Sequence, residues 1–252
     1  MRRIEQVGHR VAELQLALAS QTDIAEFAPQ PISAQDARSW MDALLRRANH
    51  ALDELARRRS DLKEGDRTLI DRLLANRAAL PVLLRDLLPE TVDALKIRHH
   101  GDFHLGQMLI AKDDVFIIDF EGEPRRSIEE RRRKAPAARD VAGLIRSIDY
   151  SVTAALERAL KSAPDEQGKI ARALAGWRDA AVTAFMAGYR GTLSDARLWP
   201  QGLHDADRLL DFFLLEKAFY EIEYELAHRP DWLRVPLAGT WRIISQSEGV
   251  VS

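Results

Sequence analysis

The sequence predicts a mostly helical fold with one small β-hairpin. Long segments carry apolar residues at helical spacing, beginning with Val7, Val11 and Leu14. Only one region has the pattern of two paired strands, residues 108–110 and 115–118, which flank a polar turn. A chain with many long amphipathic segments and one hairpin therefore belongs to the mostly α class.

Length and composition limit the function. The chain has 252 residues with 46% hydrophobic residues, enough for one large domain or two modest ones. Its formal net charge of -2 lacks the basic excess of a nucleic-acid-binding protein. It contains no cysteine, no apolar run long enough to span a membrane and no signal-peptide pattern, so we predict a cytoplasmic protein.

The expected helices follow from periodicity and from their end signals. Ser33 is a natural cap for the second helix, and Pro81 should interrupt the one after it. The last long helix is too apolar for a surface element and should be largely buried. The predicted helices span residues 4–27, 33–59, 65–80, 82–88, 141–160, 165–189 and 207–228.

Residues 97–121 hold the densest group of chemically useful side chains. Gly101 permits a sharp bend after His100. The hairpin should return Asp119 to the neighbourhood of Asp102 and Gln107. The full group is His100, Asp102, His104, Gln107, Asp119 and Glu121.

Kinase-type phosphoryl transfer requires side chains of these types at this spacing. One Asp orients or deprotonates the attacking hydroxyl, while an amide and a second Asp hold Mg²⁺ against the ATP phosphates. Asp102 can fill the first role, Gln107 and Asp119 the second, and Glu121 is a further candidate ligand. The alternative is a polar hairpin with merely solvated acids, which the spacing disfavours.

Two motifs carry a family resemblance. His-Gly-Asp-Phe-His-Leu-Gly-Gln at 100–107 and Ile-Ile-Asp-Phe-Glu-Gly-Glu-Pro at 117–124 resemble the catalytic segments of aminoglycoside-phosphotransferase-like kinases. Within that superfamily they are most similar to the maltokinase family, found alone or fused to trehalose synthase. Generic members have Asn where this chain has Gln107. The resemblance covers about 8–237 and places Gln15, where the family usually has His, towards the sugar site.

The resemblance implies that residues 1–252 form the C-terminal lobe of a protein-kinase-like fold. Its parts would be a helical region at 4–95, the catalytic loop and Mg-binding hairpin at 96–121, a charged activation-segment-like loop at 122–139, and a helical substrate-side region at 140–237. Asp140 is a natural helix cap, and the resemblance also has it brace the catalytic loop. His100 and Gly101 would support that loop structurally.

The charged loop contains Arg125, Arg126, Glu129 and Glu130, followed by the basic run 131–134. One interpretation has these arginines close over the substrate or its phosphates. The other, which we favour, is a mobile and solvated loop.

The acceptor site is expected near residues 216–237. Acids and aromatic side chains alternate there, and by themselves they fit an amphipathic helix as well as a sugar site. The sequence from 215 to 237 resembles the C-terminal signature of maltokinases, which implies a pocket for maltose or a related small sugar. The candidate substrate-binding residues are His104, Tyr220, Tyr224, Glu225, Arg229 and Trp232.

A complete kinase also has an N-terminal β-rich lobe that clamps the nucleotide. The chain shows no Gly-rich loop followed by a strand Lys, so we expect this lobe to be absent and the isolated chain to have little activity. A separate polypeptide is then a candidate partner.

Several functions remain open at this point. The first is formation of maltose 1-phosphate from maltose and ATP, and the second is phosphorylation of another small hydroxylated molecule. The third is a non-catalytic binding module associated with trehalose synthase. The fourth is a metal-dependent phosphohydrolase that uses His100, Asp102, His104 and Asp119.

Overall fold

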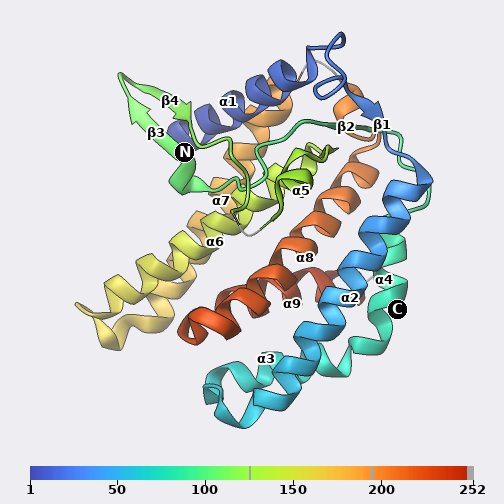
Figure 1. The fold of residues 1–252 in the computed structure, drawn as a ribbon. Helices are drawn as coiled ribbons and strands as arrows, with labels where there is room; N and C mark the ends of the chain where they lie inside the picture. Colours follow the sequence, from blue (N-terminus) through green and yellow to red (C-terminus); the bar gives the residue numbers. More distant parts are fainter. Residues whose placement is uncertain (125, 194–195, 249–252) are drawn as a thin grey trace. The chain divides into compact units, whose positions relative to one another are not determined.

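The computed structural model describes residues 1–124, 126–193 and 196–248, so Arg125 of the charged loop lies outside the described residues. The chain divides into two compact units. Unit 1 comprises Met1–Pro31 and Ala94–Trp199, and unit 2 comprises Ile32–Asp93 and Pro200–Ser252. The described residues are mostly helical with small antiparallel sheets, as predicted (Figure 1).

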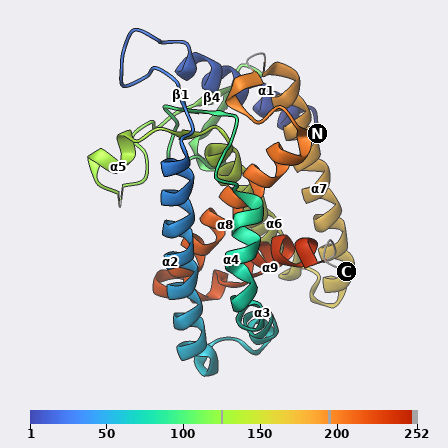
Figure 2. The ribbon, with the colours of Figure 1, turned by 90° about the vertical axis from the view of Figure 1, so that its right-hand side faces the viewer.

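Three long helices and one short helix belong to unit 1. They are α1 (Arg2–Ala19), α6 (Ala138–Leu160), α7 (Gln167–Thr192) and the short α5 (Ile128–Arg132). Helix α7 packs against both α1 and α6 (Figure 2). The largest buried side chains in this core include Phe185 and Tyr189 of α7.

Unit 1 also contains both sheets. The predicted hairpin is present as β3 (Met108–Ala111) and β4 (Asp114–Ile117), with Leu109 opposite Phe116. A second sheet has the antiparallel order β1 (Gln30–Pro31), β2 (Leu95–Ile97) and β5 (Ala135–Pro136). Sequence reasoning missed this sheet because strands of two or three residues are too short to show alternation.

Gln15 lies in the core of unit 1. It is fully buried, and its Nε2 donates to the carbonyl of Ala137 at 3.1 Å. Its Oε1 accepts from the hydroxyl of Tyr189, which in turn accepts from Nε1 of Trp199 at 2.7 Å. The expectation that Gln15 faces a sugar site is therefore wrong: its amide satisfies buried polar groups between α1 and α7.

Unit 2 is helical throughout its described residues. Its helices are α2 (Ala34–Arg58), α3 (Glu64–Ala75), α4 (Leu80–Leu87), α8 (Leu203–His228) and α9 (Arg234–Glu248). Ser33 caps α2 as predicted, through a reciprocal capping box with Asp36. Helix α8 is buried along most of its length, which confirms its predicted place in the core.

Several boundaries differ from prediction. Helix α1 ends at Ala19, before the polar run that begins at Ser20, and not at 27. The helix predicted to run from 65 to 80 ends at Ala75, and Pro81 lies in the first turn of α4, where its missing N–H is not needed. Helix α9 had no counterpart in the prediction. Asp140 is not the cap of α6, because that helix starts at Ala138 with Ala137 as its cap.

The charged loop is folded. Ser127 caps the short helix α5 through a capping box with Glu130, so part of the loop that we expected to be mobile and solvated is helical. The loop then ends in strand β5.

In the part of the chain that the structure describes, no helix is both long and apolar enough to cross a membrane.

Candidate active site

The catalytic loop of unit 1 is held by Asp140. Its Oδ2 accepts from the backbone N–H of His100 at 2.8 Å, and its Oδ1 accepts from that of Gly101 at 3.0 Å. Asp140 is buried, so these charge-assisted bonds form in a poorly hydrated environment, where they are strong. Gly101 has φ of 87°, which a side chain would strain, and lies against Gly122.

His100 ties this loop to the end of the hairpin. Its Nε2 donates to the carbonyl of Ile118 at 2.9 Å, and its Nδ1 accepts from the N–H of Asp102 at 3.4 Å. The ring lies between Phe103 and Phe120, with centroid distances of 5.0 and 5.1 Å. Both ring nitrogens are engaged with backbone groups, which suits a structural role and disfavours His100 as a metal ligand.

Asp102 follows this braced segment and is partly exposed. The next residue, Phe103, is buried, and its carbonyl lies so close to Gly143 of α6 that a Cβ there would come within 2.6 Å. The loop backbone is therefore fixed on both sides of Asp102. Asp140 holds the residues before it, and Gly143 packs against the residue after it; both belong to α6. Its carboxylate is carried on a rigid support, as a catalytic group requires.

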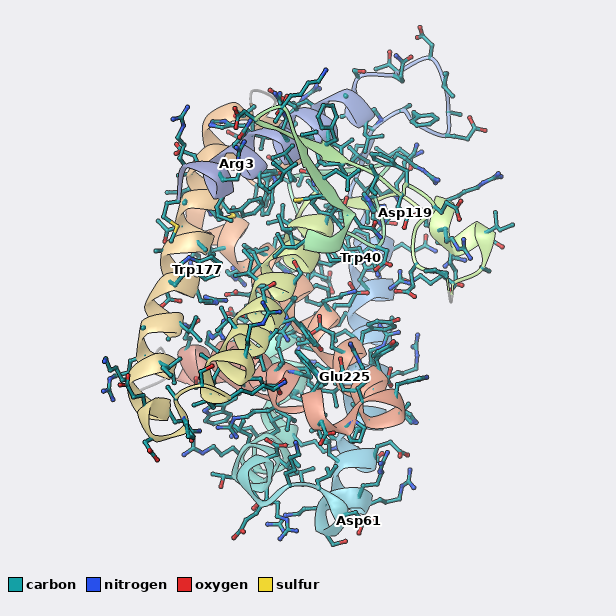
Figure 3. All side chains as sticks on the ribbon, turned by 90° about the vertical axis from the view of Figure 1, so that its left-hand side faces the viewer. Arg3, Trp40, Asp61, Asp119, Trp177 and Glu225 are labelled. Carbon is teal, nitrogen blue, oxygen red and sulfur yellow. The ribbon has the colours of Figure 1, made fainter. Side chains whose placement is uncertain are left out.

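The hairpin brings Gln107 and Asp119 together. Gln107 Nε2 donates to Asp119 Oδ2 at 2.9 Å, and the N–H of Ile118 donates to the carbonyl of Gln107 at 3.0 Å. Asp119 has φ of 65°, in the left-handed region that non-glycine residues rarely adopt (Figure 3). Such strained residues are often found at functional sites.

The donor set fits Mg²⁺ bound together with phosphates. An amide oxygen and a carboxylate are hard ligands, and Mg²⁺ in nucleotide enzymes commonly uses one or two carboxylates beside the phosphates. Among the described residues, no three His, Asp or Glu side chains lie together in a way that could hold a metal ion. Glu121 is exposed and makes no hydrogen bond or ion pair with the described residues.

His104 lies at the start of the turn that carries Gln107. Its Nδ1 accepts from the N–H of Gly106 at 3.0 Å, and its Nε2 lies 3.4 Å from Gln107 Nε2. This arrangement suits a residue that shapes the loop and lies next to Gln107.

His99, which precedes His100 in the chain, was not identified as a candidate from the sequence. It is buried, its Nδ1 has no hydrogen-bond partner among the described residues, and burial lowers its pKa to about 4. Nearby Arg139, Arg126 and Arg98 act in the same direction. At neutral pH the imidazole is therefore uncharged.

Two cations of the charged loop bind backbone carbonyls within unit 1. Arg131 donates to the carbonyls of Arg126 and Pro124 at 2.9 and 2.8 Å. Lys134 donates to the carbonyls of Ala25 and Ala28 at 2.7 and 2.6 Å. These bonds hold the loop in shape, and they engage side chains that the sequence left free to reach a phosphate.

The predicted acceptor residues of unit 2 form one cluster on and just after the C-terminal part of α8, where Figure 3 labels Glu225. Glu225 is buried, and its two oxygens accept from Nε and Nη2 of Arg229 at 3.0 and 2.7 Å. The guanidinium of Arg229 lies over the rings of Tyr224 and Trp232, 5.2 and 5.8 Å from their centroids. Glu225 and Arg229 thus bind each other and support the aromatic rings.

The cluster also includes Tyr220, which the sequence indicated, and two neighbours that it did not indicate, His228 and Arg47. Tyr220 lies 6.5 Å from Tyr224, and His228 stacks on Tyr224 at 4.8 Å. Arg47 of α2 lies 5.5 Å from the Tyr220 ring and binds Glu223 at 3.1 Å. No local pattern predicts the contribution of Arg47, because α2 and α8 are far apart in the chain.

Comparison with known proteins supports a kinase-like fold. No protein-family model matches the chain. Glucosamine kinase of Mycolicibacterium smegmatis (strain ATCC 700084 / mc(2)155) is 33% identical over 238 residues, which are 91% of this chain and 50% of that protein. Glucosamine kinase of Streptacidiphilus jiangxiensis is 37% identical over 137 residues, 54% of this chain and 29% of that protein.

Solved structures agree. Glucosamine kinase in complex with glucosamine, ADP and inorganic phosphate matches with a TM-score of 0.78 at 26% identity, over 99% of this chain and 56% of that one. Crystal form B of glucosamine kinase matches with a TM-score of 0.77 over 97% of this chain and 53% of that one.

The chain thus has the fold of part of a glucosamine kinase, and it spans half or less of the length of the curated relatives it matches. The sequence prediction of a kinase-like fold is confirmed at this level. These relatives are named glucosamine kinases, so they do not support the more specific prediction that the chain is a maltokinase.

Proposed function

We propose that this chain is the catalytic part of an ATP-dependent sugar kinase whose acceptor is glucosamine. The observation that carries the proposal is the pairing of Gln107 with the left-handed Asp119, beside a loop that presents Asp102 on a rigid support. An amide, a strained Asp and a separately held Asp are the parts that phosphoryl transfer by the kinase route requires.

Each residue has a distinct role in this proposal. Asp102 orients the acceptor hydroxyl and takes up its proton as the oxygen attacks the terminal phosphorus of ATP. The bond from that phosphorus to the bridging oxygen breaks, and ADP leaves with the electron pair. Gln107 and Asp119 hold Mg²⁺, with Glu121 as a further candidate ligand. Bound Mg²⁺ neutralises charge on the phosphates. Asp140, His100 and Gly101 keep the loop backbone in place, because catalysis here depends on positioning.

The nucleotide base has a candidate platform on the hairpin. Leu109 and Phe116 are cross-strand partners, and they are 53% and 52% exposed. Large apolar side chains exposed side by side usually mark a binding surface. The pair lies on the two strands that connect Gln107 to Asp119, so a base resting on it would leave its phosphates near the metal-binding residues.

Glucosamine is proposed as acceptor because both curated relatives are named glucosamine kinase and one matching structure is a complex with glucosamine and ADP. In unit 2, taken by itself, the candidate contacts are the cluster of Tyr220, Tyr224, Glu225, Arg229 and Trp232. In unit 1, taken by itself, His104 is a separate candidate. Because Glu225 and Arg229 bind each other, we expect the aromatic side chains to make the direct contacts.

Maltose is the second candidate acceptor. It is favoured by the similarity of residues 215–237 to the C-terminal signature of maltokinases. Trehalose synthase, or a separate polypeptide that supplies an N-terminal lobe, would then be a candidate partner.

The test is Mg²⁺-dependent transfer of phosphate from ATP, with glucosamine, maltose and glucose offered separately. Since the chain spans half or less of its curated relatives, the assay compares this chain with a version extended upstream to the relatives' length. Asp102→Asn should reduce kcat by at least roughly a hundredfold. The matched control is Asp165→Asn, which changes an exposed Asp outside the site and should leave the rate unchanged.

Each outcome decides between hypotheses. Faster turnover of glucosamine than of maltose supports the proposal, whereas the reverse preference favours the maltokinase alternative. Release of phosphate from phosphate esters without any nucleotide would favour a phosphohydrolase. No transfer to any of the sugars by either form would reject the kinase proposal and leave a non-catalytic binding module.

A further inference from the structure

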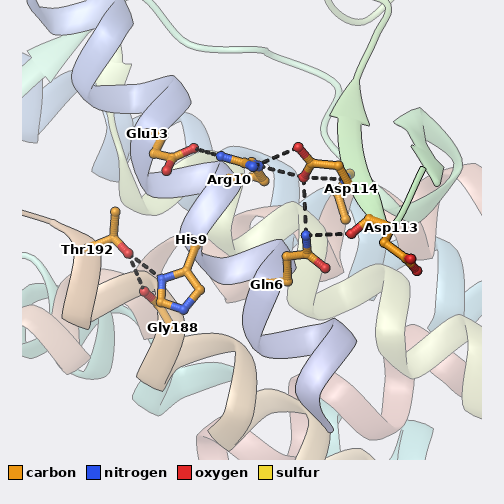
Figure 4. A network of polar contacts seen from close by, with 9 residues as sticks. Gln6, His9, Arg10, Glu13, Asp113, Asp114, Gly188 and Thr192 are labelled. Atoms are coloured by element: carbon orange, nitrogen blue, oxygen red, sulfur yellow. Dashed lines mark hydrogen bonds and ion pairs between the residues drawn. The ribbon is translucent and has the colours of Figure 1, made fainter. Parts of the chain in front are cut away.

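Helix α1 holds the turn of the β3–β4 hairpin through a network of polar contacts (Figure 4). Arg10 makes two parallel bonds to one carboxylate: Nε donates to Asp114 Oδ1 at 2.8 Å and Nη2 donates to Asp114 Oδ2 at 2.7 Å. Two parallel bonds from one guanidinium fix the relative orientation of the two side chains as well as their distance. Glu13, one turn along α1, binds the remaining nitrogen of Arg10.

Two further side chains of α1 bind the turn itself. Gln6 Nε2 donates to the carbonyl of Asp113 at 3.0 Å, and Arg3 Nη1 donates to the same oxygen at 2.6 Å. Lys112 and Asp113 both have positive φ, 51° and 61°, as a tight two-residue turn between strands requires. Such a turn has little conformational freedom, so the position in which Asp114 is held determines where the rest of β4 lies.

Strand β4 links this anchor to the proposed metal site. It runs from Asp114 to Ile117, and Ile118 and Asp119 follow directly. At the far end, the carbonyl of Ile118 accepts from His100, and the carboxylate of Asp119 accepts from Gln107. The hairpin is therefore fastened at its turn by α1 and at its base by the catalytic loop.

The ionised state of the Asp114 carboxyl favours its ion pair with Arg10. The hydrogen bond from Arg10 is the main cause that lowers the pKa of the Asp114 carboxyl, with a further contribution from the backbone N–H of Val115. Asp114 is thus ionised throughout the range in which a kinase works. Of the α1 side chains described above, Arg10 binds both carboxylate oxygens of Asp114 in β4.

We propose that Arg10 is a positioning residue, whose ion pair with Asp114 sets the angle of the hairpin on α1 and thereby the place of Asp119 beside Gln107. The proposal rests on the proposed function for its catalytic consequence. Its structural part, the link between Arg10 and the Gln107–Asp119 pair, is independent of that function and is measured separately.

The experiment uses three variants of the whole chain. Arg10→Gln removes the ion pair, and the double variant Arg10→Asp with Asp114→Arg restores it with the charges exchanged. The matched control is Arg59→Gln, which breaks a similar two-bond ion pair with Asp71 in unit 2, where both distances are 2.6 Å. All of the changed side chains are partly exposed, so the variants should fold, and circular dichroism checks that they do.

The first readout is the pair of side-chain amide NMR signals of Gln107, without and with Mn²⁺ as a probe of the metal site. Arg10→Gln should shift these signals and weaken Mn²⁺ binding roughly tenfold, because a small displacement of a ligand is costly. The exchanged pair should recover most of the affinity, and Arg59→Gln should change neither quantity. Unchanged Gln107 signals in Arg10→Gln would overturn the proposal.

The second readout is kinetic. In the form of the protein that phosphorylates a sugar, Arg10→Gln should raise KM for MgATP roughly tenfold and leave KM for the sugar within about twofold. Equal increases in both constants would point to general loosening of the fold and contradict a positioning role. If neither form is a kinase, the NMR arm still decides whether Arg10 positions Asp119, so the two failures are distinguishable.

Discussion

Gly8 of α1 and Gly188 of α7 each lie against the backbone of the other helix. A Cβ on Gly8 would lie 2.2 Å from the carbonyl oxygen of Phe185, and one on Gly188 would lie 2.1 Å from that of Glu5. Real Cβ atoms do not approach carbonyl oxygens so closely, so both helices need hydrogen at these positions. The crossing carries α1, which in turn holds the hairpin.

The first prediction concerns this crossing. Gly188→Ala should lower the free energy of unfolding by about 2–3 kcal/mol, because the helices must separate to admit the methyl group. Gly176→Ala on the same helix is the matched control. No atom lies within 4 Å of a Cβ there, so it should be neutral or stabilising by up to about 1 kcal/mol. Urea unfolding of both variants measures the difference, and similar values would contradict the steric explanation.

The second prediction concerns the brace behind the catalytic loop. Asp140→Ala removes the acceptor of the His100 and Gly101 N–H groups. Leaving two buried donors without a partner should cost about 2–4 kcal/mol. Hydrogen exchange should accelerate most at these two amides. Asp165→Ala, at an exposed position, is the control and should leave exchange at the loop as it is; acceleration spread evenly over unit 1 would argue against a local brace.

The third prediction concerns the end of α8. Arg229→Met leaves the buried carboxylate of Glu225 without its two-bond partner, which should cost about 2–3 kcal/mol, less than for a wholly buried pair because Arg229 is half exposed. The near-UV circular dichroism of Tyr224 and Trp232 should weaken as well. Arg59→Met, which breaks a two-bond ion pair with Asp71 in which both side chains are exposed, should lower the free energy of unfolding far less. Equal losses in the two variants would mean that the Glu225 pair has no special weight.

The fourth prediction concerns pH. Burial, together with Asp207, raises the pKa of Asp211 on α8 to about 6. The folded state therefore holds the proton more tightly than the unfolded state. The contribution of Asp211 to stability is complete below about pH 4 and is lost as the pH rises through 6. At pH 7.5, Asp211→Asn should therefore be more stable than the parent chain by about 1–2 kcal/mol.

His99 titrates in the same range with the opposite sign, because its pKa is lowered and its contribution is lost as the pH falls towards 4. The measurement is therefore the difference in Tm between Asp211→Asn and the parent chain from pH 4 to 8. That difference should grow with pH. A constant difference, or one that shrinks, would show that Asp211 titrates normally.

Much of the candidate site could be predicted because it is local in sequence. Asp102 and Gln107 are five residues apart, and a polar turn between two short apolar runs returns Asp119 to Gln107. Turn chemistry and alternation act over a few residues, so one sequence is enough to recognise them. The cap at Ser33 and the burial of α8 were predictable for the same reason.

Other features depended on partners far away in the chain. Asp140 looks like a helix cap in sequence, yet its carboxylate binds the loop some forty residues earlier. Gln15 looks like a site residue and is a buried partner of Tyr189. Arg10 has the appearance of a solvated charge until β4 places Asp114 beside it. In each case the role follows from a neighbour that periodicity cannot supply.

By itself, the sequence determined the mostly helical class, the hairpin and the return of Asp119 to Gln107, because spacing and turn residues act within one segment. Only the tertiary structure decided which residues hold these parts in place: the glycines of the α1–α7 crossing, the Arg10 anchor, and Asp140 behind the loop. The physical reason is that close packing and buried hydrogen bonds join segments that are far apart in the chain, and their partners exist only once the chain has folded.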